Sequence, residues 1–467
     1  MERYGLQTLS TLVIGYLGLF DLGLGRAATQ QVSNALGSDN RDRVPGIFWT
    51  SLLLMFLLGI LAAALLAGLT PWLVHRLLNI PSVLQSEGER VFFALAVSLP
   101  FVISGSSLSG TLVAFQRFDY MTSVGASVGI FSFIAPLAML GLTHNLAWIV
   151  AVLVLGRLLA WGAMFVLCLR TAPELTTNLQ VSGALARPLL SFGGWITISG
   201  IASPMMAYFD RFVIASMFAL SSVSYYTVPF QIVNKLGILS GAMAGVLFPA
   251  FSATAQSNTS RASLLFERGT RYSVIALFPG LLLVFVFAPE ILTVFFGADL
   301  ARHGLAVLRC LVPGVFVNSL AYVPGGLVLG INRPDLPAKF HLLELPIYLV
   351  ALVLLLPRLG ITGAAIAWSL RVTLDAGLFY AAATVLLPET RVAVGRLACF
   401  SFVVLVSIGI AALLSSLEAR LVYVAVSLVM FFTISWAYLL ESTERAILIR
   451  QVLRSNFKVP APNQIAR

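Results

Sequence analysis

The sequence contains very little charge. Of its 467 residues only 10% are Asp, Glu, Lys or Arg, whereas 59% are hydrophobic. A soluble domain carries about 25% charged residues, so this chain has too few to cover a surface that faces water. Its apolar stretches are roughly 20 residues long, the length of a helix that crosses a bilayer, and they recur from end to end. The composition therefore predicts an all-α, polytopic membrane protein.

The sequence also lacks the motifs of several enzyme and metal-binding classes. It has no G-x-x-x-x-G-K-[ST] phosphate loop, which argues against an ATPase, and no G-x-S-x-G elbow at a strand–helix turn. His75, His144, His303 and His341 are far apart and show no zinc-ligand spacing. No polar stretch is long enough to fold into a soluble domain. We expect no enzyme activity, no cofactor and no metal site.

Cysteine is scarce as well. The three cysteines, Cys168, Cys310 and Cys399, lie inside apolar runs and are odd in number. We interpret them as packed free thiols rather than as a disulfide framework.

Apolar runs bounded by charged turns predict about 13 membrane spans. Many of the runs contain proline, which removes a helical hydrogen bond and bends the helix. The predicted spans are residues 5–26, 47–74, 91–115, 120–142, 146–170, 188–216, 221–254, 271–296, 303–330, 337–357, 361–387, 396–416 and 420–440.

Basic residues are concentrated in alternate loops, and this distribution predicts the orientation. By the positive-inside rule the richer side is cytoplasmic, which places the C-terminus inside. Topology then accounts for most of the net charge of +10, and no nucleic-acid partner is needed. The richer side includes Arg41, Arg43, Arg117, Arg170, Arg187, Arg261, Arg268, Arg271, Arg333, Lys339, Arg391, Arg396 and the basic tail, whereas the other side has Arg3, Arg76, Arg90, Arg302, Arg358 and Arg420.

An internal repeat indicates two related halves. "GTLVAFQRFD" at residues 110–119 resembles "GLVLGINRPD" at 326–335, and Pro100 upstream matches Pro313. Transporters are often built from such repeats. We predict two pseudo-symmetric helical lobes around a central cavity, and the first lobe lacks a counterpart of the helix at 188–216. The expected design is 14 helices, with this chain starting one helix late through a mis-assigned start codon or a real truncation. The predicted units are an N-terminal lobe of five helices (1–175), a C-terminal lobe of six (176–390), and two trailing helices with a basic cytoplasmic tail (391–467).

Ionisable residues within the spans are candidate functional residues because they are costly to bury in a bilayer. Cations outnumber acids at comparable depth, which favours an anionic substrate whose oxygens suit guanidinium groups, such as a pyrophosphate or an acidic sugar. Structural pairing remains the alternative for each residue. The predicted substrate-binding residues are Arg26, Arg157, Lys235 and Arg371, and the residues predicted to serve ion coupling or pairing are Asp21, Asp210, Arg211 and Asp375.

Three stretches resemble one transporter family. "ERYGLQTLSTLVIGYLGLFDLGLGRAATQ" (2–30) resembles the second helix of the Wzx-like oligosaccharide flippases, in the polysaccharide-transporter branch of the multidrug/oligosaccharidyl-lipid/polysaccharide exporter superfamily. "SFGGWITISGIASPMMAYFDRFVIA" (191–215) and "SYYTVPFQIVNKLGILSGAMAGVLFPAFS" (224–252) resemble its seventh and eighth helices. The departure from the family pattern is the lacking first helix.

The resemblance implies a function in the synthesis of surface polysaccharides such as lipopolysaccharide or exopolysaccharide. A polyprenyl-pyrophosphate-linked oligosaccharide would move from the cytoplasmic to the periplasmic leaflet of a bacterial inner membrane. The resemblance implies ion-coupled alternating access, with Arg26 at the cytoplasmic mouth of the cavity, and it allows a partnership with the polysaccharide polymerase machinery.

Four alternatives remain open at this point. The nearest is a drug or cation antiporter of the same superfamily. Deep carboxylates without an excess of arginine would favour that function. A peptidoglycan-precursor flippase would also suit a cationic cavity. A membrane polymerase or ligase is disfavoured because no long external loop is present. The last is a non-transporting assembly partner of the polymerase.

Overall fold

The computed structural model describes residues 23–77, 82–140, 145–255, 257–439 and 445. Within them, 12 segments are long and apolar enough to cross a membrane. They match 12 of the expected spans, whereas the first, at 5–26, lies mostly outside the described residues. The helices are α2 (Leu24–Gly37), α3 (Val44–Trp72), α4 (Ser82–Ala114), α5 (Phe118–Leu140), α6 (Leu146–Thr171), α7 (Glu174–Thr177), α8 (Gly183–Met217), α9 (Leu220–Asn234), α10 (Ile238–Thr254), α11 (Thr259–Val286), α12 (Ala288–Phe296), α13 (Ala298–Gly330), α14 (Asp335–Leu359), α15 (Ile361–Leu386), α16 (Arg391–Ala411) and α17 (Leu417–Ile434).

Three boundaries differ from those expected. The span at 221–254 is two helices, because a 3-10 turn at Lys235–Gly237 separates α9 from α10. The span at 271–296 is also two helices, α11 and α12, and α11 begins at Thr259. It begins early because the Asn258 side chain caps it, accepting a hydrogen bond from the backbone N–H of Arg261 at 2.9 Å. Finally, α2 continues to Gly37, beyond the end expected at residue 26.

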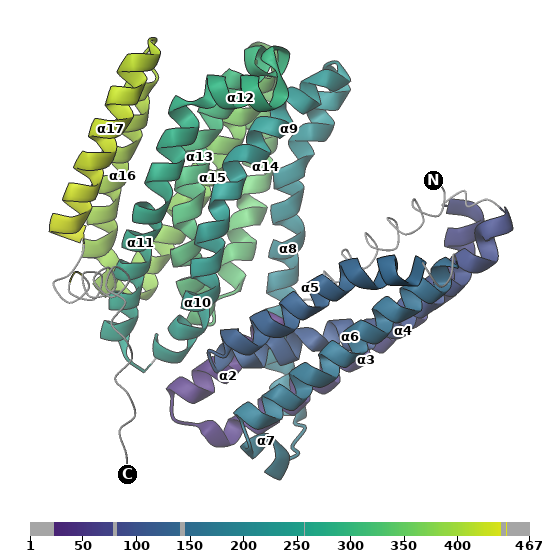
Figure 1. Cartoon of the computed structure of the whole chain (residues 1–467). Coiled ribbons are helices and arrows are strands. Elements are labelled where there is room, and N and C mark those ends of the chain that lie inside the picture. The colour runs from purple at the N-terminus through teal and green to yellow at the C-terminus, as the bar shows by residue number, and fades with distance from the viewer. Residues whose placement is uncertain (1–22, 78–81, 141–144, 256, 440–444, 446–467) are drawn as a thin grey trace, which may run out of the picture.

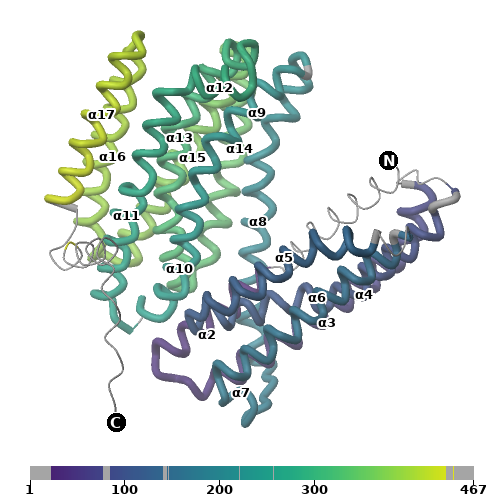
Figure 2. The backbone as a smooth tube through the Cα atoms, in the orientation of Figure 1, coloured from purple at the N-terminus to yellow at the C-terminus, as the bar shows by residue number. Residues whose placement is uncertain are grey.

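The helices form two groups (Figure 1). Helices α2 to α6 make up the first group, and α9 to α15 make up the second. The long helix α8 packs on α14 and α9 of the second group and on α2 and α3 of the first. Figure 2 shows the two groups inclined to one another, converging where α2 and α10 meet. The lobe boundaries at residues 175 and 390 stay a prediction.

The two groups meet at their arginine-rich ends. Helix α2 packs against α10 and α8, and α4 also reaches α10. A Cβ atom at Gly37, the last residue of α2, would overlap the backbone of Ala253 near the end of α10. The buried Gln30 side chain donates a hydrogen bond to the carbonyl oxygen of Gly330 at 3.4 Å. These contacts close the molecule at the side predicted to be cytoplasmic.

The turns after α4 and α13 are alike, as the internal repeat predicts for this segment. Both helices span 33 residues. Each is followed by a residue in the left-handed region, Gln116 with φ 57° and Asn332 with φ 66°. In each turn an arginine then donates two hydrogen bonds to an aspartate two residues later, Arg117 to Asp119 and Arg333 to Asp335. The repeated sequence thus forms the same local structure twice.

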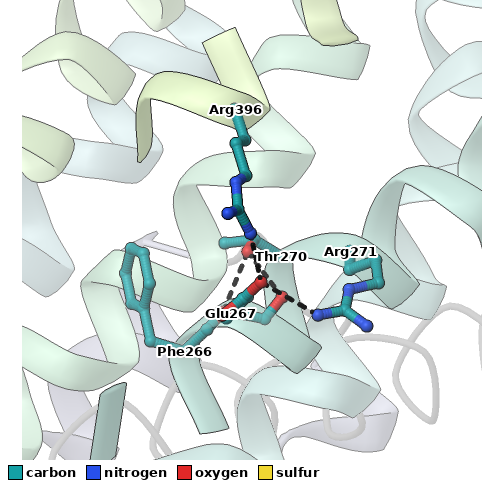
Figure 3. Close-up of polar contacts among 5 residues, drawn as sticks. All are labelled: Phe266, Glu267, Thr270, Arg271 and Arg396. Carbon is teal, nitrogen blue, oxygen red and sulfur yellow. Dashed lines mark hydrogen bonds and ion pairs between the residues drawn. The ribbon is translucent and has the colours of Figure 1, made fainter. Parts of the chain in front are cut away.

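Ion pairs hold the two trailing helices to the second group. Arg396 of α16 contacts the Glu267 carboxylate of α11 at 3.5 Å, and Arg271 contacts the same carboxylate at 3.0 Å (Figure 3). Near the opposite end, Arg420 of α17 contacts Glu290 of α12 at 2.8 Å. α16 and α17 therefore lie at the outer edge of the second group, away from the first.

Candidate functional site

A cavity of about 620 Å³ lies where the second group faces the first. Helices α8, α9, α10, α13, α14 and α15 line it, and α2 contributes Arg26 from across the gap. Its wall combines amides and hydroxyls with aromatic rings. The polar lining includes Ser199, Ser203, Asn234 and Asn318, and the aromatic lining includes Tyr208, Phe230, Tyr322, Trp368 and Phe379.

A cluster of ionisable side chains forms one part of this wall, where α14 packs on α15. His341, Arg371 and Asp375 line the cavity, and Glu344 lies fully buried behind them. His341 Nε2 is 3.8 Å from Asp375 Oδ1, and its Nδ1 is 2.9 Å from the hydroxyl of Ser199 on α8. Arg371 Nε is 4.0 Å from Glu344 Oε2. We refer to His341, Glu344, Arg371 and Asp375 as the α14–α15 cluster.

Helical spacing explains how the sequence builds this cluster. His341 and Glu344 are three residues apart on α14, and Arg371 and Asp375 are four apart on α15, so each pair shares one helix face. The hairpin between the helices turns at Gly360, where φ is 60° and ψ is −150°, a region that only glycine readily adopts. The two faces are thereby brought into contact.

The cluster contains more acid than was expected. The Glu344 carboxyl faces the Arg371 guanidinium and the Asp375 carboxyl faces His341, and neither Glu344 oxygen has a hydrogen bond among the described residues. Arg26 is the second arginine of the cavity, and its side chain is exposed. The cavity wall therefore holds two arginines and one carboxyl, that of Asp375, with the Glu344 carboxyl buried behind it.

Arg26 lies near the start of α2. Because α2 continues to Gly37, Arg26 is in the first described turn of that helix rather than at its cytoplasmic end. Eleven further residues of helix correspond to roughly 16 Å along its axis. Arg26 is among the residues that line the cavity, and its place at the cytoplasmic mouth stays a prediction.

Asp210 and Arg211 form a separate pair. Asp210 is fully buried, and it accepts a hydrogen bond from the hydroxyl of Tyr226 and another from the Arg211 backbone at 2.8 Å. The Arg211 guanidinium lies 3.2 Å from the same carboxylate. The geometry is that of a satisfied structural pair on α8, which the hydroxyl of Tyr226 links to α9.

The other predicted residues are not brought to this cavity. Lys235 is exposed, begins the 3-10 turn that separates α9 from α10, and is not among the lining residues. Arg157 is half-buried on α6, in the first group. Asp21 lies outside the described residues.

The residues predicted from the sequence to form the site did not include His341 or Glu344. Both lie on one face of an otherwise apolar helix, three residues apart, and this spacing was the available signal. Their proximity to Arg371 and Asp375 depends on the packing of α14 against α15, which no local pattern indicates.

Comparison with known proteins identifies the family. A model of the family described as "Polysaccharide biosynthesis protein" matches residues 1–301. The chain belongs to this family. A "Putative O-antigen transporter" of Shigella flexneri is 28% identical over 389 residues, which cover 80% of this chain and 88% of that protein. A "Probable low-salt glycan biosynthesis flippase" of Haloferax volcanii is 24% identical over 214 residues, which cover 45% of this chain and 43% of that protein.

Solved transporter structures share the fold. A Vibrio cholerae MATE transporter in the bent form superimposes with a TM-score of 0.68 at 15% identity, covering 84% of this chain and 90% of that one. An outward-facing MATE family transporter of the MOP superfamily superimposes with a TM-score of 0.63 at 13% identity, covering 84% of this chain and 94% of that one. This member of the polysaccharide biosynthesis family is thus a multi-pass membrane protein with a MATE-like fold, and its relatives are transporters rather than enzymes.

Proposed function

We propose that the protein moves a polyprenyl-pyrophosphate-linked oligosaccharide from the cytoplasmic to the periplasmic leaflet of a bacterial inner membrane, by ion-coupled alternating access between two lobes. The observation that carries the proposal is that Arg26 of the first group and Arg371 of the second line the same cavity. The family and the names of its relatives support the substrate class.

The chemistry of the cavity suits such a head group. Guanidinium groups bind phosphate oxygens through charge-assisted hydrogen bonds. Asn234, Asn318 and the serines of α8 offer hydrogen-bond partners to sugar hydroxyls, and Trp368 and Tyr322 offer aromatic faces. The polyprenyl tail would stay in the bilayer, where its apolar surface is solvated by lipid.

A second candidate is an antiporter for organic cations. Asp375 and Glu344 favour it, since buried carboxyls beside a cavity attract positive charge. The two arginines of the same cavity disfavour it because they repel such a substrate.

Ligand stabilisation of the purified protein separates these candidates. A ligand at 100 times its Kd stabilises the folded state by about 2.7 kcal/mol, which raises the temperature of thermal unfolding. We expect this shift with a polyprenyl-pyrophosphate oligosaccharide and none with tetraphenylphosphonium. Polyprenol without the pyrophosphate controls for binding of the tail. A shift with the cation alone would favour the antiporter.

A further inference from the structure

The α14–α15 cluster contains two buried carboxyls that the described residues leave incompletely satisfied. Neither oxygen of Glu344 has a hydrogen bond, and neither has Asp375 Oδ1. Glu344 is 0% exposed and Asp375 is 6% exposed. Buried ionised carboxylates need hydrogen-bond donors or a counter-ion, so this arrangement calls for an additional positive charge.

Arg371 cannot supply all of that charge. Its Nε lies 4.0 Å from Glu344 Oε2, which is longer than a hydrogen bond, and the same Nε has no hydrogen bond of its own. One guanidinium also balances only one of two carboxylates. Arg371 approaches Glu344, and Asp375 lies one turn further along the same face of α15, so both carboxyls belong to one buried cluster. Two carboxylates that share a buried site bind a proton between them rather than both staying ionised.

The cluster is reachable from the cavity. Asp375 and His341 both line the cavity, and His341 Nε2 faces Asp375 Oδ1 at 3.8 Å. A proton from the cavity therefore meets Asp375 first and Glu344 behind it. Other ionisable groups on the surrounding helices include Arg371 on α15, Tyr348 on α14, Tyr208 and the Asp210–Arg211 pair on α8, Tyr226 on α9, Tyr322 on α13 and, across the cavity, Arg26 on α2.

We propose that Glu344 and Asp375 form a proton-binding pair, and that protonation of this pair frees Arg371 to hold the anionic head group of the substrate. The role of the head group rests on the proposed function, whereas the proton-binding pair does not. When the pair is ionised, its carboxylates balance the positive charge of Arg371. With the pair protonated, the same charge is available to a pyrophosphate.

The sign of the coupling follows from this geometry. Proton uptake makes the cavity more positive, so anion affinity rises as the pH falls. Linkage is reciprocal, so anion binding must in turn draw a proton onto the pair. With one linked proton, the affinity changes by at most about tenfold per pH unit within the titration range.

Infrared difference spectroscopy tests the proton-binding pair without any substrate. Acidifying the purified protein in lipid should produce the C=O band of a buried protonated carboxyl, and the Glu344→Gln/Asp375→Asn double variant should lose it. Glu389→Gln is the matched control, because Glu389 is exposed in the turn after α15. If the band persists unchanged in the double variant, the pair is not the proton site. The single variants Glu344→Gln and Asp375→Asn serve if the double variant does not fold.

Binding of inorganic pyrophosphate tests the coupling. Its affinity should fall between pH 6 and pH 8 more steeply in the wild-type protein than in the double variant, whose remaining slope reports titration of the pyrophosphate itself. Equal slopes would overturn the coupling. If pyrophosphate does not bind at any pH, the cavity is not a head-group site and the proposed function loses support. The infrared result would still test whether Glu344 and Asp375 bind a proton.

Discussion

Buried charge occurs in two different environments, one on α8 and one where α14 packs on α15. The Asp210 carboxylate accepts hydrogen bonds from Tyr226 and from Arg211, so its charge is satisfied inside the protein. Glu344 is equally buried, but among the described residues it has no hydrogen bond, and the Arg371 guanidinium lies 4.0 Å away. A satisfied pair holds two helices together, whereas an incompletely satisfied pair beside a cavity can exchange its partner. This difference separates a structural role from a transport role.

The first residue-scale prediction concerns the structural pair. Asp210→Asn should destabilise the folded protein by about 1–3 kcal/mol, because Arg211 loses its buried counter-ion. Tyr226→Phe should cost about 1 kcal/mol, since Asp210 keeps the hydrogen bonds from Arg211. Thermal unfolding in detergent measures both, with Glu389→Gln as a neutral surface control. An Asp210→Asn protein as stable as wild type would contradict the structural assignment.

A second residue-scale prediction concerns Arg371. Replacing it with Gln removes the charge, and replacing it with Lys keeps the charge but loses the planar fork. Arg371→Gln should weaken pyrophosphate binding about 10- to 100-fold, because a hydrogen bond between charged groups is lost. Arg371→Lys should weaken the binding less. Calorimetry at fixed pH measures both affinities. Arg358→Gln, an exposed cation at the far end of α14, is the control.

At the scale of helices, the contact of α2 with α10 closes the arginine-rich side. Gly37 lies so close to Ala253 that any side chain there would overlap backbone, which cannot move aside as a flexible side chain can. Gln30 adds a hydrogen bond to the end of α13. In a protein that alternates between two states, these contacts stabilise the one in which this side is closed.

Gly37→Ala should therefore shift the protein away from the closed arrangement. Overpacking costs about 1–3 kcal/mol, which corresponds to a population shift of roughly 5- to 150-fold. Labelling of a cysteine introduced at Leu329, in a background without native cysteines, reports opening from the arginine-rich side. Gly125→Ala on α5 is the control, because a Cβ atom there would meet nothing within 4 Å. Equal labelling in both variants would show that the contact does not gate access.

The helices could largely be predicted from the sequence, because a bilayer requires long apolar runs. The break at Lys235–Gly237 and the early start of α11 could not, since local capping and turn geometry override the apolar pattern there. The Arg371–Asp375 half of the α14–α15 cluster followed from helical spacing. The Glu344–His341 half required knowing that α14 packs on α15, and the absence of Lys235 from the lining residues could not be read from its position within an apolar run.

At the scale of the whole molecule, the two helix groups converge at one side of the membrane, and a cavity lies between them (Figure 1). Arg26 and Arg371 approach this cavity from opposite groups, so an anion bound to both would connect the two groups. Rotation of one group against the other would then separate the two arginines and release the anion. The proposed transport cycle follows from this arrangement.

The most direct measurement uses sealed vesicles that contain the full chain. A labelled polyprenyl-pyrophosphate oligosaccharide is placed in one leaflet, and its appearance in the other is followed over time. The account predicts faster appearance than in empty vesicles, strongly reduced rates for Arg26→Gln and Arg371→Gln, and an unchanged rate for the Arg358→Gln control. Wild-type vesicles no faster than empty ones, or both cavity variants as fast as wild type, would contradict it.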